Sequence, residues 1–533
     1  MRTGEAARRS APESGESPDA RTGITAWLLR HRANARLAFG LRSLSLGVGA
    51  VAALVWARLL VGTLGVELYG LFLAFVAIAQ LGGLGDFGLA GAVGIRMSGM
   101  LARREDEAGR RFLANARGVF LVLAGALFLL VLAASPWLPE LFRFSPLPGA
   151  GSLPLLFAIG GAGVGLLVLG GYISNLNYIH GNLVWPIVPT LVLTQLTFAG
   201  QWLLASTRAP LWAQYSVQVA TSAVALGLGW WMLRVSHPWL GELRPVRFDR
   251  AEGCRLGRTS VWAYFATLGS LIYTTTDSIL INAGFGSSAL PAYRFNYKLC
   301  ELCVTLLGSM SFVALPAIAA RLFGADEMQR SFGLSGVERL QRFQVVAATA
   351  AGLGYLCVND WFIRLWVGPA FQVPLALQVA FALNLAITIS GDIGIQLIGR
   401  LHQRGLRLAA LTIAGTGLLN LALSLVAVRL GSILGIAVAT VIAQSVSSLI
   451  LNRATCRAIG LDSRRWAARA WLFPFVVVAL GGTARWLLPP DSFAPAVALV
   501  TICIALLATL AWLAGISRRM LLDEWERLRA TFR

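Results

Sequence analysis

The sequence predicts an all-α polytopic membrane protein with about 14 transmembrane helices, arranged as two six-helix lobes and two further C-terminal helices. Three observations predict this fold class. Hydrophobic residues make up 57% of the chain and charged residues only 13%, whereas soluble domains are roughly 45–50% apolar and about 25% charged. The apolar residues form runs near the ~20 residues that a helix needs to cross a bilayer. Basic residues gather in every second connection between these runs.

The predicted spans follow one another with short connections. In lipid only helices and closed barrels satisfy every backbone hydrogen bond, and runs of this length are helical. In the first half, the spans are expected near residues 44–64, 69–95, 113–134, 153–174, 183–205 and 211–233. In the second half, they are expected near 260–284, 290–319, 343–365, 373–398, 406–428 and 433–451, followed by 470–488 and 494–516.

These spans define the expected domain organisation. The predicted parts are a basic cytoplasmic tail (1–43), an N-lobe (44–233), a basic cytoplasmic linker (234–259), a C-lobe (260–451), spans thirteen and fourteen (452–516) and a second cytoplasmic tail (517–533). Local echoes between the lobes, such as Tyr69 with Tyr293 and Gly65 with Gly286, indicate a duplication. Because each repeat has an even number of spans, both are expected to insert with the same orientation.

The distribution of charge orients the chain. Most of the 45 basic residues lie in alternate connections, and the opposite connections carry only five arginines: Arg143, Arg208, Arg364, Arg429 and Arg485. The positive-inside rule therefore predicts that both termini are cytoplasmic. The net charge of +20 is spread over loops that would face an anionic leaflet, so we expect membrane lipids and no nucleic acid as its partners.

Several kinds of chemistry are not expected. The only lysine, Lys298, is followed by Leu299, so the chain has no Walker A sequence. Cys300 and Cys303 form a C-x-x-C motif with no second pair and no histidine nearby, which favours packing residues over a metal site. The predicted outer loops are short and carry no catalytic constellation. We therefore expect a transporter with no cofactor and no metal, rather than an enzyme.

Charged residues inside the predicted spans are the candidate functional residues. Each costs roughly 2.5–3.5 kcal/mol near the bilayer centre, so none is expected to face lipid. They are Arg58, Asp86, Asp277, Arg294, Lys298, Glu301 and Asp392.

The eighth span carries three of these charges on one face. Arg294, Lys298 and Glu301 stand at i, i+4 and i+7, so this face is expected to line water. Asp277 lies at a similar depth to Lys298 in a helical hairpin, close enough to pair, and Arg58 lies at comparable depth in the opposite lobe. We therefore expect Arg58, Arg294 and Lys298 to form a cationic, substrate-binding cavity.

The four acidic residues Asp277, Glu301, Asp86 and Asp392 are candidates for coupling or gating. The alternative is that the charges only neutralise one another, Lys298 with Glu301 or Asp277, while Arg58 snorkels to the outer surface. For Asp86 and Asp392 a structural role is equally compatible with the sequence.

The chain resembles the polysaccharide exporter branch, of the O-antigen flippase type, in the multidrug/oligosaccharidyl-lipid/polysaccharide (MOP) exporter superfamily. The resemblance covers residues 42–451 and depends on the order and spacing of short motifs. In the N-lobe these are Arg58-Leu-Leu, Gly65-x-Glu67-x-Tyr69-Gly70-x-Phe72 and Asp86-Phe87-Gly88. In the C-lobe they are Asp277, Ile281, Tyr293, Pro316, Arg321, Gly368, Phe371, Asn420, Gly431, Gly435 and Ala439-Thr440.

The resemblance implies a V-shaped, MATE-like bundle in the bacterial inner membrane. Such a protein flips undecaprenyl-pyrophosphate-linked sugar units by alternating access, in lipopolysaccharide O-antigen or exopolysaccharide biosynthesis. A polysaccharide polymerase and a chain-length regulator are then expected partners, and transport could be coupled to H⁺ or Na⁺. Two alternatives remain open: an ion-coupled multidrug exporter of the related MATE type, and a membrane-embedded enzyme or scaffold of envelope assembly.

The predicted topology can be tested with reporter fusions. Fusions after Leu147 and Ala209 should report the periplasm and one after Arg250 the cytoplasm, because the charge asymmetry recurs in successive loops. The opposite result at two of these three sites would overturn the topology.

Overall fold

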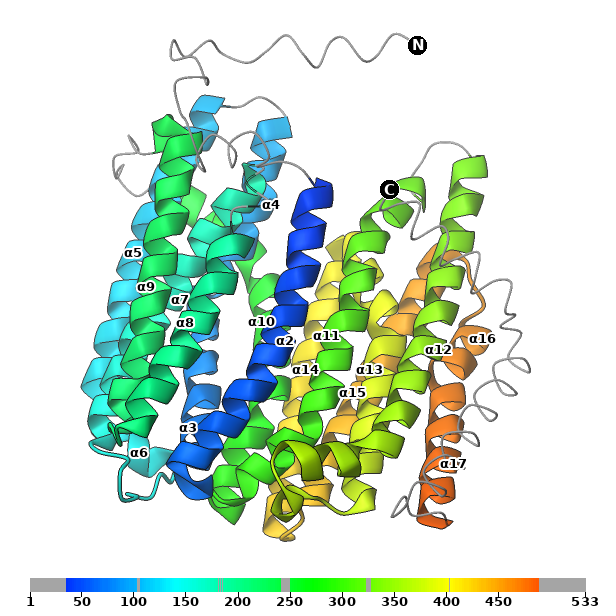
Figure 1. Cartoon of the computed structure of the whole chain (residues 1–533). Coiled ribbons are helices and arrows are strands. Elements are labelled where there is room, and N and C mark those ends of the chain that lie inside the picture. Colours follow the sequence, from blue (N-terminus) through cyan, green and yellow to red (C-terminus); the bar gives the residue numbers. More distant parts are fainter. Residues whose placement is uncertain are drawn as a thin grey trace.

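The computed structural model describes residues 35–487, except 103–105, 181, 183, 185, 241–249, 323–326 and 402. The described residues are almost entirely helical and contain no strand (Figure 1). Eleven of the described helices are long and apolar enough to cross a membrane. These features confirm the predicted all-α, polytopic membrane fold. The last predicted span, 494–516, lies outside the described residues, as do both predicted tails for most of their length.

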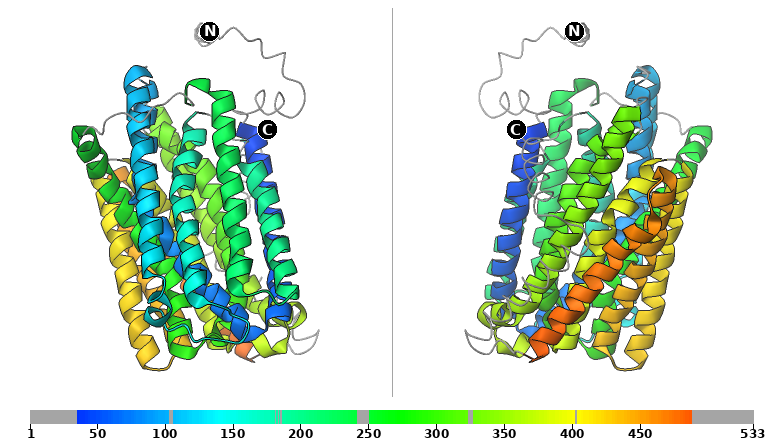
Figure 2. Two further views of the ribbon diagram at one scale, coloured as in Figure 1. Left: turned by 90° about the vertical axis from the view of Figure 1, so that its left-hand side faces the viewer. Right: turned by 90° about the vertical axis from the view of Figure 1, so that its right-hand side faces the viewer.

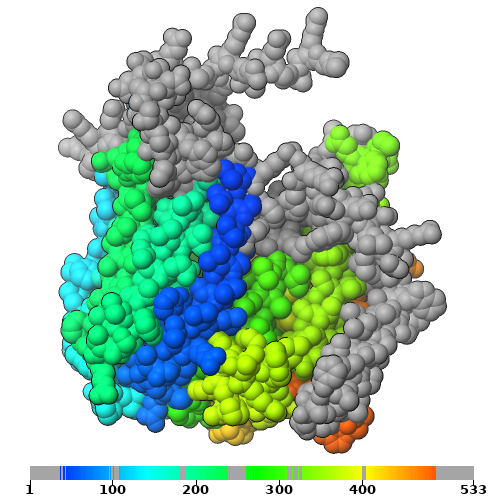
Figure 3. All heavy atoms as spheres, in the orientation of Figure 1, coloured from blue at the N-terminus to red at the C-terminus, as the bar shows by residue number. Residues whose placement is uncertain are grey.

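The first lobe contains the helices that precede residue 237. They are α2 (Ala35–Leu64), α3 (Val66–Leu81), α4 (Leu89–Ala102), α5 (Asp106–Ala134), the short α6 (Leu138–Leu141), α7 (Leu153–Ile179), α8 (Ile187–Ser206) and α9 (Leu211–Ser236). Helix α7 packs between α5 and α9, and α2 packs against α8. In Figure 3, α2 (blue) lies along the boundary between the two lobes on the face shown.

The second lobe contains longer helices. They are α10 (Arg250–Phe285), α11 (Ala289–Leu322), α12 (Glu327–Trp366), α13 (Leu375–Leu401), α14 (Gln403–Arg429) and α15 (Ile433–Ile459). Helix α10 lies along α14, and α13 lies along α15 and α12. Several helices extend beyond the predicted spans: α2 begins at Ala35, inside the predicted tail, α10 begins at Arg250, inside the predicted linker, and α12 begins at Glu327 rather than near 343. Polar and charged residues extend these helices beyond their apolar runs.

The segment after the second lobe forms one more span. It consists of α16 (Ser463–Ala467), a π-helical turn η6 (Ala468–Leu472) and α17 (Phe473–Leu487). The Asp462 carboxylate caps α16, because it accepts the backbone N–H groups of Arg464 and Arg465, and these bonds lower the pKa of that carboxyl. Helix α17 packs against α12 and α13. The right panel of Figure 2 shows it (orange) crossing the second lobe obliquely.

The second predicted span, 69–95, is interrupted in the middle. Helix α3 passes into a 3₁₀ turn, η3 (Gly82–Asp86), and α4 begins after it. Asp86 Oδ1 accepts the Gly88 backbone N–H at 2.9 Å, and Phe87 and Gly88 have φ values of 48° and 72°. The glycine-rich sequence permits this left-handed backbone, which a continuous helix does not allow. Asp86 therefore shapes a break in the span.

The two lobes meet closely at the end of the bundle that holds the α2–α3 and α10–α11 turns. A Cβ atom on Gly70 would lie 1.8 Å from the Ser287 carbonyl oxygen, so only glycine fits there. Tyr69 stacks on Phe295 with ring centroids 5.8 Å apart. The Trp366 indole N–H donates to the Leu54 carbonyl at 2.7 Å. The predicted periplasmic end of the boundary between the lobes is therefore closed in this structure.

Candidate functional site

A polar cavity of about 430 Å³ lies in the second lobe and reaches the first. Helices α10, α11, α13, α14 and α15 line it, and Gln80 of α3 closes one side. Its wall carries hydroxyl and amide groups, including those of Tyr273, Tyr293, Tyr297, Asn384, Thr440 and Gln444. The cavity also contains three charged residues, Arg294, Glu301 and Asp277. This concentration of polar groups within a membrane-spanning bundle marks it as the candidate site.

The charged face of α11 faces this cavity in part, as the spacing of its residues predicts. The Glu301 carboxylate Oε2 lies 3.1 Å from Lys298 Nζ and 3.9 Å from Arg294 Nη2. Arg294 and Glu301 line the cavity, and Lys298 pairs with Glu301 beside it. One carboxylate is thus shared by two cations, so the α11 face carries a net positive charge.

Asp277 is buried between four helices. Its Oδ2 atom accepts hydrogen bonds from the Tyr293 hydroxyl of α11 at 2.9 Å and from the Thr440 hydroxyl of α15 at 3.1 Å. The predicted pairing of Asp277 with Lys298 is wrong, because Lys298 is paired with Glu301 on its own helix. Hydroxyl groups, and not a cation, are the direct neighbours of this carboxylate.

Two buried polar atoms at this site have no hydrogen-bond partner among the residues that the structure describes. They are Asp277 Oδ1, an acceptor, and Asn420 Nδ2, a donor. The Thr440 hydroxyl lies 3.1 Å from both Asp277 Oδ2 and Asn420 Oδ1, but its single hydrogen can be donated only once. A buried oxygen without a donor is costly. A bound proton, a small cation or a turn of the Asn420 amide towards Asp277 would relieve this cost.

Besides Lys298, three predicted site residues lie away from the cavity wall. Arg58 is exposed on α2 and donates to the Leu365 carbonyl of α12 at 3.3 Å, so the structure does not bring it together with Arg294 and Lys298. Asp86 forms the break between α3 and α4. Asp392 is half-buried in α13 and accepts a hydrogen bond from Gln396 at 2.7 Å.

Sequence reasoning missed some neutral polar residues of the site, among them Tyr273 and Asn384. The Tyr273 hydroxyl donates to Asn384 Oδ1 at 3.0 Å, and Asn384 Nδ2 donates to the Tyr297 hydroxyl at 3.2 Å. A periodic signal for such residues was present in the sequence. The cavity-lining residues of α10 recur at helical spacing, at Ser270, Tyr273, Thr274 and Asp277, as do Thr440, Gln444 and Ser447 of α15.

A two-lobed helical bundle with a polar cavity near the boundary between its lobes is the architecture of transporters that work by alternating access. The family model described as "Polysaccharide biosynthesis protein" matches residues 39–321, which is more than half of the chain. The chain therefore belongs to this family, and the predicted resemblance is confirmed. None of the curated proteins is significantly similar to it in sequence.

Solved structures with the same fold include a flippase and multidrug transporters. The lipid II flippase MurJ in an inward closed conformation has a TM-score of 0.61 and 14% identity, over 88% of this chain and 97% of that chain. A MATE structure in complex with MaL6 has a TM-score of 0.50 and 13% identity, over 82% and 99% of the two chains. MATE in the bent conformation has the same TM-score and identity, over 83% and 98%. At these identities the likeness establishes the fold.

The Asp277 hydrogen bonds predict a difference between two buried tyrosines of the second lobe. Tyr293→Phe should lower the free energy of unfolding by about 1.5–3 kcal/mol, because it removes a hydrogen bond to a buried carboxylate. Tyr355→Phe should be neutral or stabilising, because the Tyr355 hydroxyl is buried without a partner among the described residues. Thermal unfolding of the purified variants in detergent measures both. Equal effects would show that the Tyr293 bond contributes no net stability.

Proposed function

We propose that the protein is a flippase that moves polyprenyl-pyrophosphate-linked oligosaccharides across the bacterial inner membrane by alternating access. The observation that carries the proposal is the cavity itself, in which Arg294 stands among hydroxyl and amide groups. An arginine binds pyrophosphate oxygens through paired, charge-assisted hydrogen bonds. Hydroxyl and amide groups exchange hydrogen bonds with sugar hydroxyls. Membership of the polysaccharide biosynthesis family supports the same substrate class.

The arrangement of charge supports an anionic substrate. On α11, Lys298 and Arg294 share one carboxylate, so this face of the helix has one positive charge in excess, which the Asp277 carboxylate of α10 offsets unless it binds a proton or a cation. Lys298 holds Glu301 and keeps the carboxylate from neutralising Arg294 fully. Asp277 lies deeper and is screened by Tyr293 and Thr440. A drug exporter that selects cations would benefit from the reverse arrangement.

Alternating access requires the closed end of the boundary between the lobes to open. The contacts that would separate are small: Tyr69 on Phe295, Trp366 on Leu54, and Arg58 on the Leu365 carbonyl. In this proposal Arg58 therefore helps to close the boundary between the lobes and does not bind the substrate in the cavity. The break between α3 and α4 gives the first lobe a place to bend.

Arg294→Gln tests the substrate. It should weaken binding of a lipid pyrophosphate about 10- to 100-fold, which is the loss expected for a hydrogen bond to a charged group. The resulting loss of transport is measured as polymer recovery in a deletion strain and as flipping of labelled lipid-linked oligosaccharide in proteoliposomes. Arg58→Gln is the matched control, because it removes an intramembrane arginine outside the cavity and should leave binding unchanged. Wild-type flipping by Arg294→Gln, or transport of cationic drugs in place of the lipid, contradicts the proposal.

We also propose that transport is coupled to a proton or sodium ion bound at Asp277. The buried Asp277 carboxylate supports this role, because its Oδ1 atom has no donor among the described residues, a bound proton would satisfy it, and hard cations prefer oxygen ligands. Tyr293 connects this carboxylate to α11, one residue before Arg294. Ion binding at Asp277 would thereby be linked to the position of the substrate-binding arginine.

Asp277→Asn should abolish the response of flipping to imposed ion gradients, because a neutral amide neither takes up a proton nor attracts a cation. Flipping in proteoliposomes is measured with proton, sodium or no gradient. Asp86→Asn is the control, because its amide oxygen can still accept the Gly88 N–H and the gradient response should persist. An unchanged response in Asp277→Asn would refute the coupling role and leave a passive flippase.

A further inference from the structure

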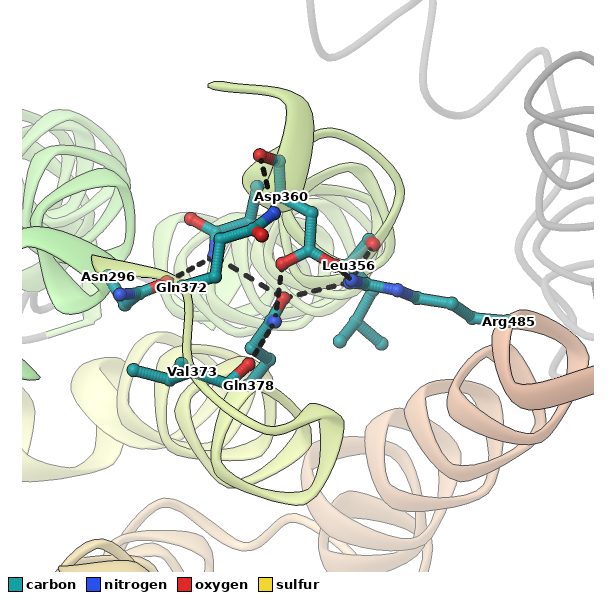
Figure 4. Close-up of polar contacts among 8 residues, drawn as sticks. Asn296, Leu356, Asp360, Gln372, Val373, Gln378 and Arg485 are labelled. Carbon is teal, nitrogen blue, oxygen red and sulfur yellow. Dashed lines mark hydrogen bonds and ion pairs between the residues drawn. The ribbon is translucent and has the colours of Figure 1, made fainter. Parts of the chain in front are cut away.

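Arg485 was assigned to an outer connection from its sequence position, but the structure buries it inside the second lobe. It lies in the last turn of α17, with 4% of its side chain exposed. Its guanidinium forms an ion pair with Asp360 of α12 and donates to the Leu356 carbonyl and, at 2.8 Å, to Gln378 Oε1 of α13 (Figure 4). The ion pair joins α17 to α12, and the hydrogen bond to Gln378 joins α17 to α13.

The hydrogen bonds continue from this pair to α11. Gln378 Nε2 donates to Asp360 Oδ1 at 2.7 Å, and Asn359 Nδ2 lies 3.3 Å from Gln378 Oε1. The same Asn359 amide donates to Asn296 Oδ1 of α11 at 2.7 Å. Figure 4 shows these side chains converging from the separate helices. Asn296, Asn359 and Gln378 are fully buried.

Such a network is an inefficient way to stabilise a bundle. Two charges in the membrane interior are expensive, and apolar replacements of a buried ion pair are often neutral or stabilising. What a buried polar network provides is a single geometry, because every donor and acceptor must keep its partner. Its value lies in what it holds in place.

Asn296 lies two residues from both Arg294 and Lys298. Residues two apart on a helix point to nearly opposite sides, so the face of α11 that is held by the network lies opposite its charged face. Asn296 also donates to the Phe371 carbonyl at 2.8 Å, in the turn between α12 and α13. These bonds fix the rotation of α11 about its axis. A rotation that broke them would turn Arg294 away from the cavity.

We propose that Arg485 and Asp360 are positioning residues that set the orientation of the substrate-binding face of α11. The claim rests on the proposed function, since it assigns Arg294 to a lipid pyrophosphate. It gives the span outside the two repeats a role: α17 contributes the cation of a network that ends at the Asn296 side chain, two residues from Arg294.

The test uses the full-length protein and undecaprenyl pyrophosphate in detergent as the probe. The variants are the double variant Arg485→Leu/Asp360→Leu, the single variant Arg294→Gln, and the triple combination. The double variant leaves no unpaired charge and should insert normally, with about 10-fold weaker binding. In the Arg294→Gln background the same pair of substitutions should have no further effect, because the network acts through Arg294. Gln378→Met interrupts the network without a change of charge and should reproduce the loss.

A matched control lies at the other end of the second lobe. The Trp466 indole N–H of α16 donates to Asn452 Oδ1 at 3.0 Å, also between the last span and the lobe. Trp466→Phe removes that bond and should leave binding unchanged. Hydrogen exchange of residues 289–301 provides a measurement independent of ligand, and it should rise in the double variant and in Gln378→Met but not in Trp466→Phe.

The outcomes separate the two proposals. Equal weakening by the double variant in both backgrounds, or unchanged exchange of α11, overturns the positioning role and makes the network a general brace. Unchanged binding in Arg294→Gln overturns the proposed function, and the exchange data then decide alone whether the network orients α11.

Discussion

The cost of placing charge in a membrane interior governs the arrangement of this protein. The described intramembrane charges of the second lobe and of α17 have specific partners: Arg294 and Lys298 share Glu301, Arg485 pairs with Asp360, Asp277 receives two hydroxyl donors, and Asp392 accepts from Gln396. Satisfying these groups requires helices to meet at fixed rotations. The packing of α11 between α12, α13 and α10 therefore follows from its polar residues as much as from its apolar ones.

The two lobes share an architecture but differ in the groups that their helices bury. The first lobe packs by apolar contact and small residues: a Cβ atom on Gly165 of α7 would lie 3.3 Å from the Ala124 carbonyl of α5. The second lobe holds the polar cavity, the buried carboxylate of Asp277 and the Asp360 carboxylate that pairs with Arg485. This asymmetry suits a transporter in which one lobe binds the substrate and the ion, while the other lobe closes against it.

The fold was predictable from sequence because bilayer thickness and backbone satisfaction leave few choices for long apolar runs. The polar face of α11 was predictable for a similar reason, since its three charges share one face of a helix. Which side chains pair with one another was not predictable. Asp277 and Lys298 lie at similar depth, but which residues meet depends on helix rotation. Arg485 was misplaced because a charge near the end of a span reads as a loop residue unless its partner, Asp360, is known.

The charged groups of the site form two regions, one around Arg294 and one around Asp277, and α11 contributes residues to both. Arg294 lines the cavity and shares one carboxylate of α11 with Lys298, and the neighbouring residue Tyr293 donates to the buried carboxylate of Asp277. A bound anion beside Arg294 would relieve the local excess of positive charge on α11, and a bound cation beside Asp277 would satisfy its Oδ1 atom. If α11 is held in one rotation by Asn296, both sites are fixed to the same rigid element. Both sites then move together when the lobes change conformation, and coupled transport requires that the two conformations bind the anion and the cation with different affinities.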